Sequence, residues 1–186
     1  EQVAGVLGCY TPELYEAECF VANKLLSMLR FPYGKVRGVD GVIEEMEMTQ
    51  GIRYAPLQRE AVTLAAQSGG LLLTGGPGTG KTTATRAIVH LFEKMGLDIL
   101  LLAPTGRAAK RMGELCEREA QTIHRCLGMS YNDLTGRVTY KKGESDPLEA
   151  EAVLVDEMSM VDLPLMQALL SALRPGCRLV MIGDAD

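Results

Sequence analysis

The residues best suited to chemistry lie in the segment GGPGTGKTT at positions 75–83, which fits the pattern G-x-x-x-x-G-K-[ST]. Glycines at this spacing let successive backbone N–H groups turn around an anion, and a helix that starts directly after them presents its positive end to the same anion. Lys81 would then supply a charge at the β- and γ-phosphates of a nucleotide, and Thr82 would offer its hydroxyl to Mg²⁺. A glycine-rich turn that binds nothing is the alternative interpretation. The residues predicted to hold a nucleotide in this segment are Gly76, Pro77, Gly78, Thr79, Gly80, Lys81, Thr82 and Thr83.

Two adjacent acids, Asp156 and Glu157, follow the apolar run AVLV at positions 152–155. Such a run is typical of a strand buried on both faces of a parallel sheet. Ligands of open α/β sheets bind beyond the carboxyl ends of the strands, so we expect both acids beside Lys81. We expect Asp156 to hold Mg²⁺ and Glu157 to orient and deprotonate the water that attacks the γ-phosphate. Asp184 also follows an apolar run and is predicted near that phosphate. Acids that merely begin a loop are the alternative.

Basic residues are concentrated in one part of an acidic chain. The net charge is −5, yet residues 103–142 contain eight Lys or Arg against four Asp or Glu. A local patch of this kind can hold a phosphate backbone, although a solvated helix face is the more usual explanation, and a lone histidine is more often structural than functional. If a helix begins near Gly106, its two sides separate into an apolar and a basic set. The apolar set is Ala108, Met112 and Leu115, and the basic set is Arg107, Lys110, Arg111 and Arg118.

Alternating strands and helices are expected to position these groups. Apolar runs at 71–74, 98–103, 152–155 and 177–182 predict strands, and helical periodicity after Lys81 predicts a helix. A short helix is expected from 56 to 68, and Asp162 is expected to cap another that ends at Pro175-Gly176. The alternation predicts an α/β fold with a mostly parallel sheet.

The part of the chain before the glycine loop is expected to be helical and then irregular. Thr11-Pro12 is typical of a helix start, and the apolar residues after it predict about 18 helical residues ending near Phe31. Residues 34–51 show no sustained period, which predicts a linker or an irregular crossing. Further along, strand-forming and turn residues mix at 128–143 and predict a small hairpin insertion.

Length and composition favour one domain in a reducing compartment. A chain of 186 residues suits one α/β domain with a small appendage. The five cysteines are odd in number and include no C-x-x-C pair, so we expect reduced, mostly buried thiols and no metal site built from them. No apolar run reaches the length of a membrane span and the first residues lack a signal pattern. We therefore expect a soluble, cytoplasmic protein without a membrane partner.

Five segments together carry a family resemblance. GGPGTGKTT, APTGRAAKRM, TIHR, VLVDEMSMVD and VMIGDAD, in this order and spacing, resemble the first motor domain of RecD-like superfamily-one DNA helicases of the RecD/TraA type, over about residues 50–186. The resemblance implies a RecA-like P-loop NTPase domain, with a five-stranded, mostly parallel sheet, helices on both faces, and the strand at 177–182 beside the P-loop strand. It also implies ATP and Mg²⁺ as cofactors and ATP-driven unwinding of DNA in the 5′ to 3′ direction. Enzymes of this kind act in DNA repair or recombination, as exonuclease V does.

The resemblance also gives roles to residues that local patterns leave open. Gln58 matches a glutamine that reads adenine in the family. Asp156 and Glu157 match the DE motif, which together with Lys81 would be catalytic. Asp184 begins a motif that couples nucleotide to DNA and that continues in the family into a glutamine. The residues that match segments along single-stranded DNA are Pro104, Thr105, Arg107, Lys110, Arg111, Thr122, His124 and Arg125.

We expect the chain to be a fragment of a longer motor. Residues 1–50 would be the tail of an N-terminal helical region, and residues 51–186 the first RecA-like domain, cut short before a second RecA-like domain with an arginine finger. Such a fragment should bind nucleotide and unwind nothing; whether the parent works alone or with nuclease-complex subunits stays open. A GTPase switch is the rival class, but Asn23-Lys24 lacks the aspartate of N-K-x-D, since Leu26 stands there. A DNA-binding module with a vestigial nucleotide site is disfavoured by the intact Lys81, Thr82, Asp156 and Glu157.

Overall fold

A computed structural model describes residues 2–3, 6–7, 9–34, 36–76, 78–133 and 136–184. Its centre is a five-stranded sheet in the order β3-β9-β8-β4-β5, in which every neighbouring pair is parallel. The strand β9 lies beside the P-loop strand β3, so the sheet implied by the family resemblance is confirmed. The strands are β3 (Gly70–Thr74), β4 (Ile99–Ala103), β5 (Ala120–Thr122), β8 (Ala152–Val155) and β9 (Arg178–Gly183).

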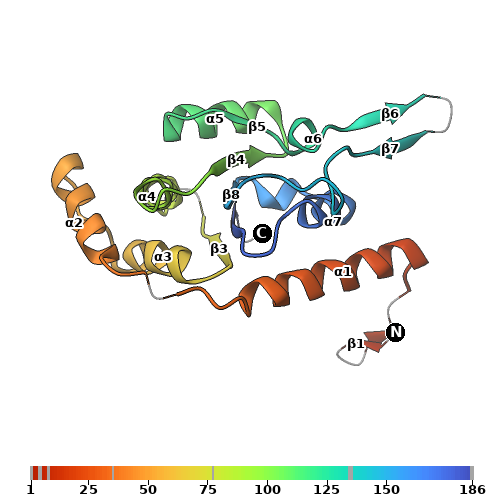
Figure 1. Cartoon of the computed structure of the whole chain (residues 1–186), viewed down its shortest axis with the longest axis horizontal. Helices are drawn as coiled ribbons and strands as arrows, with labels where there is room; N and C mark the ends of the chain where they lie inside the picture. Colours follow the sequence, from red (N-terminus) through yellow and green to blue (C-terminus); the bar gives the residue numbers. More distant parts are fainter. Residues whose placement is uncertain are drawn as a thin grey trace.

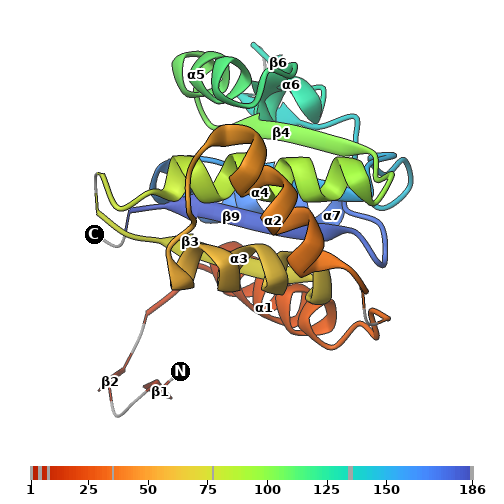
Figure 2. The same cartoon turned by 90° about the vertical axis from the view of Figure 1, so that its left-hand side faces the viewer.

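Helices cover both faces of this sheet (Figures 1 and 2). One face is covered by α2 (Val39–Gln50), α3 (Pro56–Gln67), α4 (Lys81–Lys94) and α5 (Gly106–Cys116). The other face is covered by α1 (Pro12–Leu29), α6 (Ile123–Cys126) and α7 (Leu163–Ser171). None of the helices in the described ranges is long and apolar enough to span a bilayer.

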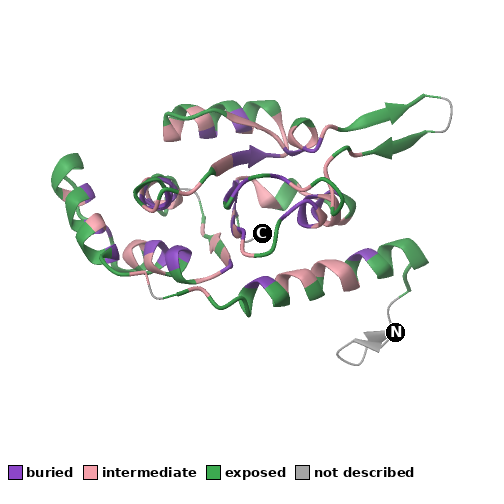
Figure 3. Ribbon diagram, viewed as in Figure 1, coloured by how far each residue is buried: buried purple, intermediate pink, exposed green. Residues whose placement is uncertain are grey.

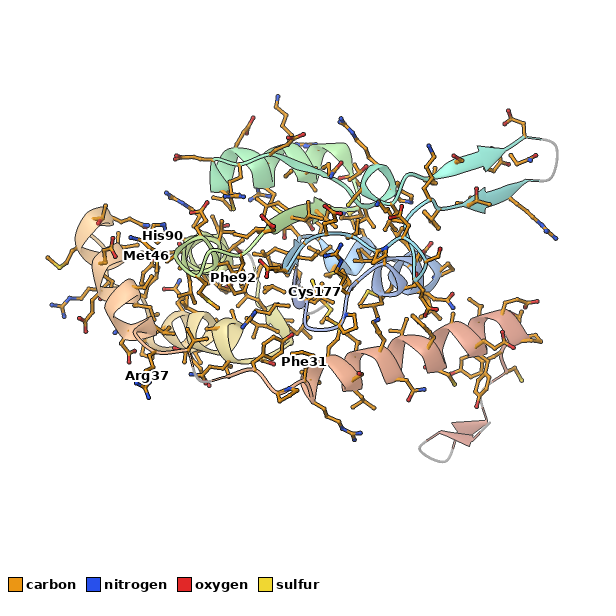
Figure 4. The ribbon with its side chains drawn as sticks, viewed as in Figure 1. Phe31, Arg37, Met46, His90, Phe92 and Cys177 are labelled. Atoms are coloured by element: carbon orange, nitrogen blue, oxygen red, sulfur yellow. The ribbon has the colours of Figure 1, made fainter. Side chains whose placement is uncertain are left out.

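The strands supply alternate residues to two buried clusters, one on each face. Leu101 and Leu154 belong to the cluster under α3 and α4, whereas Leu102 and Val155 belong to the cluster under α7. Successive strand side chains point to opposite faces, so a sheet covered on both sides needs uninterrupted apolar strands. Phe92 on α4 is fully buried in the first of these clusters (Figure 4).

The first long helix starts at the predicted Thr11 cap and has the predicted length of 18 residues. Thr11 caps α1 by accepting a hydrogen bond from Leu14 N at 3.4 Å. At the other end, the centres of the Phe31 and Tyr33 rings lie 4.8 Å apart, and the Arg178 guanidinium lies 4.3 Å from the centre of the Tyr33 ring. The Tyr33 hydroxyl donates to the carbonyl of Cys177 at 3.3 Å. These contacts fasten the segment after α1 to the start of β9.

The irregular linker expected at residues 34–51 is wrong, because α2 occupies most of it. Its buried residues Val39, Ile43 and Met46 pack against α3 and α4. Glycines flank this helix, with Gly38 and Gly51 both in the left-handed region. Val39, Val42, Ile43 and Met46 stand at i, i+3, i+4 and i+7, so the helical spacing was present in the sequence and the linker prediction overlooked it. Packing of this apolar face against neighbouring helices stabilises α2. The domain boundary at residue 50 stays a prediction, although residues on both sides of it share one buried cluster.

A hairpin extends from the body of the fold, as predicted for residues 128–143. Its strands are β6 (Ser130–Asn132) and β7 (Arg137–Thr139), which pair antiparallel and are exposed throughout (Figure 3). The sequence did not predict β5, the short η1 helix (Met158–Met160), or the small pair formed by β1 (Gln2–Val3) and β2 (Val6–Leu7).

The cysteines are less buried than expected. Only Cys177 is buried, while Cys9 is exposed and the other three are half-buried; all five are free thiols. Burial raises the pKa of Cys177 to about 12 and that of Cys116 to about 11, so both are poor nucleophiles at neutral pH.

Candidate nucleotide-binding site

The glycine-rich segment forms a loop between β3 and α4. Gly78 and Gly80 adopt φ values of 76° and 86°, in the left-handed region that glycine enters without steric cost. Gly80 is the N-cap of α4 and has no side chain that could accept a hydrogen bond. The first N–H groups of this helix therefore have no side-chain cap. Pro77 lies outside the described residues. The local structure is the strand, loop and helix that the motif requires.

The Lys81 side chain is folded across this loop. Its ammonium donates to the carbonyls of Gly75 and Gly76, the latter at 2.9 Å, and to Asp184 Oδ1 at 2.7 Å. Asp184 is within reach because β3 and β9 are neighbours, with Thr74 paired to Gly183. Figure 2 shows the end of β9 and the start of α4 at the same edge of the sheet. Asp184 therefore lies at the loop lysine, and its proximity to a bound γ-phosphate stays a prediction.

The two acids after β8 sit in a locally strained turn. Asp156 Oδ1 accepts a hydrogen bond from Glu157 N at 2.9 Å. Glu157 has φ 55° and ψ 44°, and only one other non-glycine residue in the described ranges has a positive φ. Such a conformation costs roughly 1–3 kcal/mol and persists only where the surrounding structure imposes it. The acids are thus held in a fixed arrangement at the carboxyl end of the sheet.

A cavity of about 320 Å³ joins these elements. Arg111 and Leu115 of α5 form part of its wall, although the sequence had assigned Arg111 only to DNA. Gly76, Thr83 and Gln58 do not line it. The predicted residues that the cavity brings together are Gly78, Thr79, Gly80, Lys81, Thr82, Asp156, Glu157 and Asp184.

The residues present fit a magnesium-bound nucleotide. A Cβ at Gly75 would lie 2.7 Å from Thr79 Oγ1, so the close approach of Thr79 to the start of the loop favours glycine there. Lys81, the threonine Thr82 and the acids Asp156, Glu157 and Asp184 line the same cavity, which provides charge for phosphate and oxygen ligands for Mg²⁺. Sequence reasoning missed Thr85, which is 2% exposed, lines the cavity, and donates to Lys81 O at 2.9 Å. Its position one turn after Lys81 is the available sequence signal.

Gln58 lies at the first turn of α3 and contacts the loop from outside the cavity. Its Oε1 accepts from Ala55 N at 2.9 Å, and its Nε2 donates to Gly80 O at 3.1 Å. Both ends of the side-chain amide are therefore bonded to backbone. Adenine recognition by Gln58 stays a prediction.

The predicted DNA-binding segments begin at the neighbouring strand ends. Ala103 pairs with Thr122, so the carboxyl ends of β4 and β5 are adjacent. Thr105 and Thr122 each cap a helix, accepting from Ala108 N and Arg125 N at 3.2 Å. Pro104 is half-buried directly before the first of these caps. The side chains that remain exposed around these caps are Arg107, Lys110, Arg111 and Arg125.

One detail differs from the sequence prediction for this region. The buried line on α5 is Ala109 and Met112, whereas Ala108 and Leu115 are only half-buried, because the helix packs against β5 as well as β4. His124 lines a different cavity, of about 840 Å³, between the hairpin and α7. A contact between His124 and DNA stays a prediction.

A family model and several known proteins match much of this chain. A family model described as an AAA domain matches residues 58–186. The chain is 36% identical over 180 residues to the "ATP-dependent RecD2 DNA helicase" of Deinococcus radiodurans, covering 95% of this chain and 24% of that protein. It is 35% identical over 152 residues to the "RecBCD enzyme subunit RecD" of Haemophilus influenzae, covering 68% and 23%. It is 39% identical over 114 residues to the "ATP-dependent DNA helicase dda" of Enterobacteria phage T4, covering 60% and 26%. The chain spans about a quarter of the length of these relatives.

Proposed function

Because this chain belongs to the AAA domain family, in the RecD-like branch, we propose that it is the ATP-binding motor domain of a cytoplasmic ATP-dependent DNA helicase that acts in repair or recombination. The observation that supports this proposal is the convergence of Lys81, Thr82, Asp156 and Glu157 on one cavity at the carboxyl edge of the sheet. The names of the relatives support ATP and DNA as the substrates.

Each residue of the cavity has a separate task in this proposal. Mg·ATP, when bound, supplies the γ-phosphoryl group whose transfer to water drives the motor. When nucleotide binds, the Lys81 ammonium leaves Asp184 and binds phosphate oxygens instead. Its positive charge then stabilises the negative charge that develops during phosphoryl transfer. Thr82 and Asp156 present the hydroxyl and carboxylate oxygens that Mg²⁺ prefers. Glu157 accepts a proton from the attacking water, a contribution typically worth 10²–10⁴ in rate.

The exposed basic residues provide a track for single-stranded DNA. Arg107, Lys110 and Arg125 are exposed on α5 and α6, the helices that follow β4 and β5, and other residues of α5 line the nucleotide cavity. Contacts from such side chains to phosphates position a strand without reading its sequence. A second RecA-like domain of a longer parent chain would complete both the track and the nucleotide cleft. Nuclease-complex subunits are further partners, by analogy with the relative named as a RecBCD subunit.

The test compares residues 1–186 with a longer protein that adds the second domain. Steady-state ATPase activity is measured with and without single-stranded DNA, and strand displacement is measured at low salt. An arginine contributed by a second domain is worth about 10³–10⁵ in rate, so the longer protein should show DNA-stimulated turnover and unwinding while residues 1–186 only bind Mg·ATP. A longer protein that neither hydrolyses ATP nor unwinds DNA would refute the motor assignment. Strong DNA-stimulated turnover by residues 1–186 alone would refute the two-domain account.

A further inference from the structure

Gln58 makes contacts that fit a role other than base recognition. We propose that Gln58 is a positioning residue for the phosphate loop, which holds the Gly80–Lys81 peptide in place and so strengthens binding of any triphosphate, whatever its base. The proposal rests on nucleotide binding at the cavity described above. It makes the glutamine part of the phosphate site although its side chain does not line the cavity.

The first step of the argument is the orientation of the Gln58 amide. Ala55 N donates to Gln58 Oε1 at 2.9 Å, and a backbone N–H can only be paired with the oxygen end of the amide. The nitrogen end is therefore the one that faces the loop, where it donates to Gly80 O at 3.1 Å. Both contacts agree on one orientation. The helix start of α3 thus fixes which group Gln58 presents to Gly80.

The second step concerns Gly80 itself. This residue is the N-cap of α4, with φ 86° and ψ 16°, and its carbonyl also accepts from Ala84 N at 3.0 Å. A side chain at Gly80 would approach Gln58 Nε2 to 2.2 Å, so the amide fills the space that glycine leaves free. Gln58 and Gly80 are 22 positions apart, and α3 and α4 are packed together in one buried cluster. The contact therefore joins the first turns of two neighbouring helices.

The third step links this contact to phosphate binding. In a trans peptide the C=O and N–H groups point in opposite directions, and the described ranges contain no cis peptide. A carbonyl of Gly80 held toward Gln58 therefore holds the N–H of Lys81 away from Gln58. Gly80 and Lys81 both line the cavity, and anions at such loops are bound by backbone N–H groups at the helix start. Loss of the Gln58 contact should loosen a phosphate-binding N–H without removing any group that touches the base.

The test uses the full chain of residues 1–186 and three ligands with Mg²⁺: ATP, GTP and inorganic tripolyphosphate. Dissociation constants are measured by calorimetry for the wild type, for Gln58→Met, which keeps much of the volume but loses both hydrogen bonds, and for Gln58→Ala. Gln67→Met is the matched control, since Gln67 is exposed at the far end of the same helix. Thermal unfolding of each variant is recorded. Binding is then measured well below the melting temperature, where essentially all molecules are folded.

A neutral hydrogen bond is worth about 1 kcal/mol, so both Gln58 variants should bind all three ligands roughly threefold to tenfold more weakly, while Gln67→Met is unchanged. The ratio of the ATP and tripolyphosphate dissociation constants should stay at its wild-type value. A loss confined to ATP would assign Gln58 to base recognition and overturn the proposal. Unchanged affinity for all ligands would also overturn it. A wild type that binds none of the three would instead refute the nucleotide site itself.

Discussion

The nucleotide site and the predicted DNA-binding segments lie at the same edge of one sheet but differ in construction. At the ends of β3, β8 and β9, polar groups are bonded within the protein: Lys81 to Asp184 and two carbonyls, and Asp156 to the Glu157 backbone. At the ends of β4 and β5, the threonines cap helices, and Arg107 and Arg125 form no ion pair with any described residue. Phosphoryl transfer requires groups fixed within a fraction of an ångström, whereas backbone contacts to DNA require charge and tolerate movement.

The two regions meet at α5. Its outward residues Arg107 and Lys110 are exposed, and its Arg111 lines the nucleotide cavity together with Lys81 and Glu157. One helix therefore contributes to both regions. Substitutions of single residues should reveal whether the two regions act separately or are coupled through α5.

The largest effect is expected from Glu157 in the intact parent. Glu157→Gln keeps the size of the side chain but removes the proton acceptor, so we expect kcat for ATP hydrolysis to fall about 10²–10⁴-fold with little change in Mg·ATP affinity. Steady-state ATPase assays with single-stranded DNA measure kcat, and calorimetry measures affinity. Glu149→Gln, at an exposed side chain on the surface, is the control and should leave both unchanged.

Asp156→Asn tests whether the two acids have different tasks. If Asp156 holds the metal, this variant should need a higher Mg²⁺ concentration for half-maximal hydrolysis, a shift that Glu157→Gln does not share. Mg²⁺ titrations of both variants give the comparison. Identical Mg²⁺ profiles and identical kcat values would show that the roles are wrongly divided.

Lys81→Ala should have the next largest effect, on nucleotide affinity. Hydrogen bonds to charged groups contribute about 1.5–3 kcal/mol, so we expect Mg·ATP to bind about tenfold to a hundredfold more weakly. The fold should persist, because within the described residues the Lys81 ammonium donates to loop carbonyls and to Asp184, and to no group of the buried core. Calorimetry gives the affinity and circular dichroism the fold, with Lys94→Ala on the same helix as the control. Equal ATP binding by wild type and Lys81→Ala would contradict the phosphate site.

The candidate nucleotide site could be predicted from the sequence because its patterns are local. The glycine spacing, the apolar strand before Asp156 and the Asp162 cap are all short-range patterns, and the structure contains each of them. The features that were missed depend on contacts between distant segments. The strand β5 consists of Ala120, Gln121 and Thr122, which carry no apolar run and form a strand because β4 pairs with them. The left-handed Glu157 also has no sequence signal, since its conformation is imposed by its surroundings.

The smallest expected effects separate the two regions along α5. Lys110→Ala removes an exposed cation 3.9 Å from Glu114 and outside the nucleotide cavity, so it should weaken single-stranded DNA binding and leave Mg·ATP binding unchanged. Arg111→Ala removes a cation that is exposed and also lines the cavity, so it should weaken both. Each lost phosphate contact should reduce the slope of log affinity against log salt by about 0.7 for a single strand.

The measurement is fluorescence anisotropy with a labelled single strand at several salt concentrations, together with calorimetry of Mg·ATP, on residues 1–186. Glu114→Ala, the neighbour of Lys110 one helical turn away, is a control that should not reduce the salt slope. Arg111→Ala with normal nucleotide affinity would place Arg111 with Lys110 in the DNA-binding set and would separate the two regions fully. Loss of nucleotide affinity in Lys110→Ala would show the opposite, namely that a positive charge on α5 affects nucleotide binding even when its side chain lies outside the cavity. Both variants remove one positive charge from the exposed face of the same helix. A difference in their effects on nucleotide affinity would therefore come from the positions of the two residues and would test directly whether the two regions are separate.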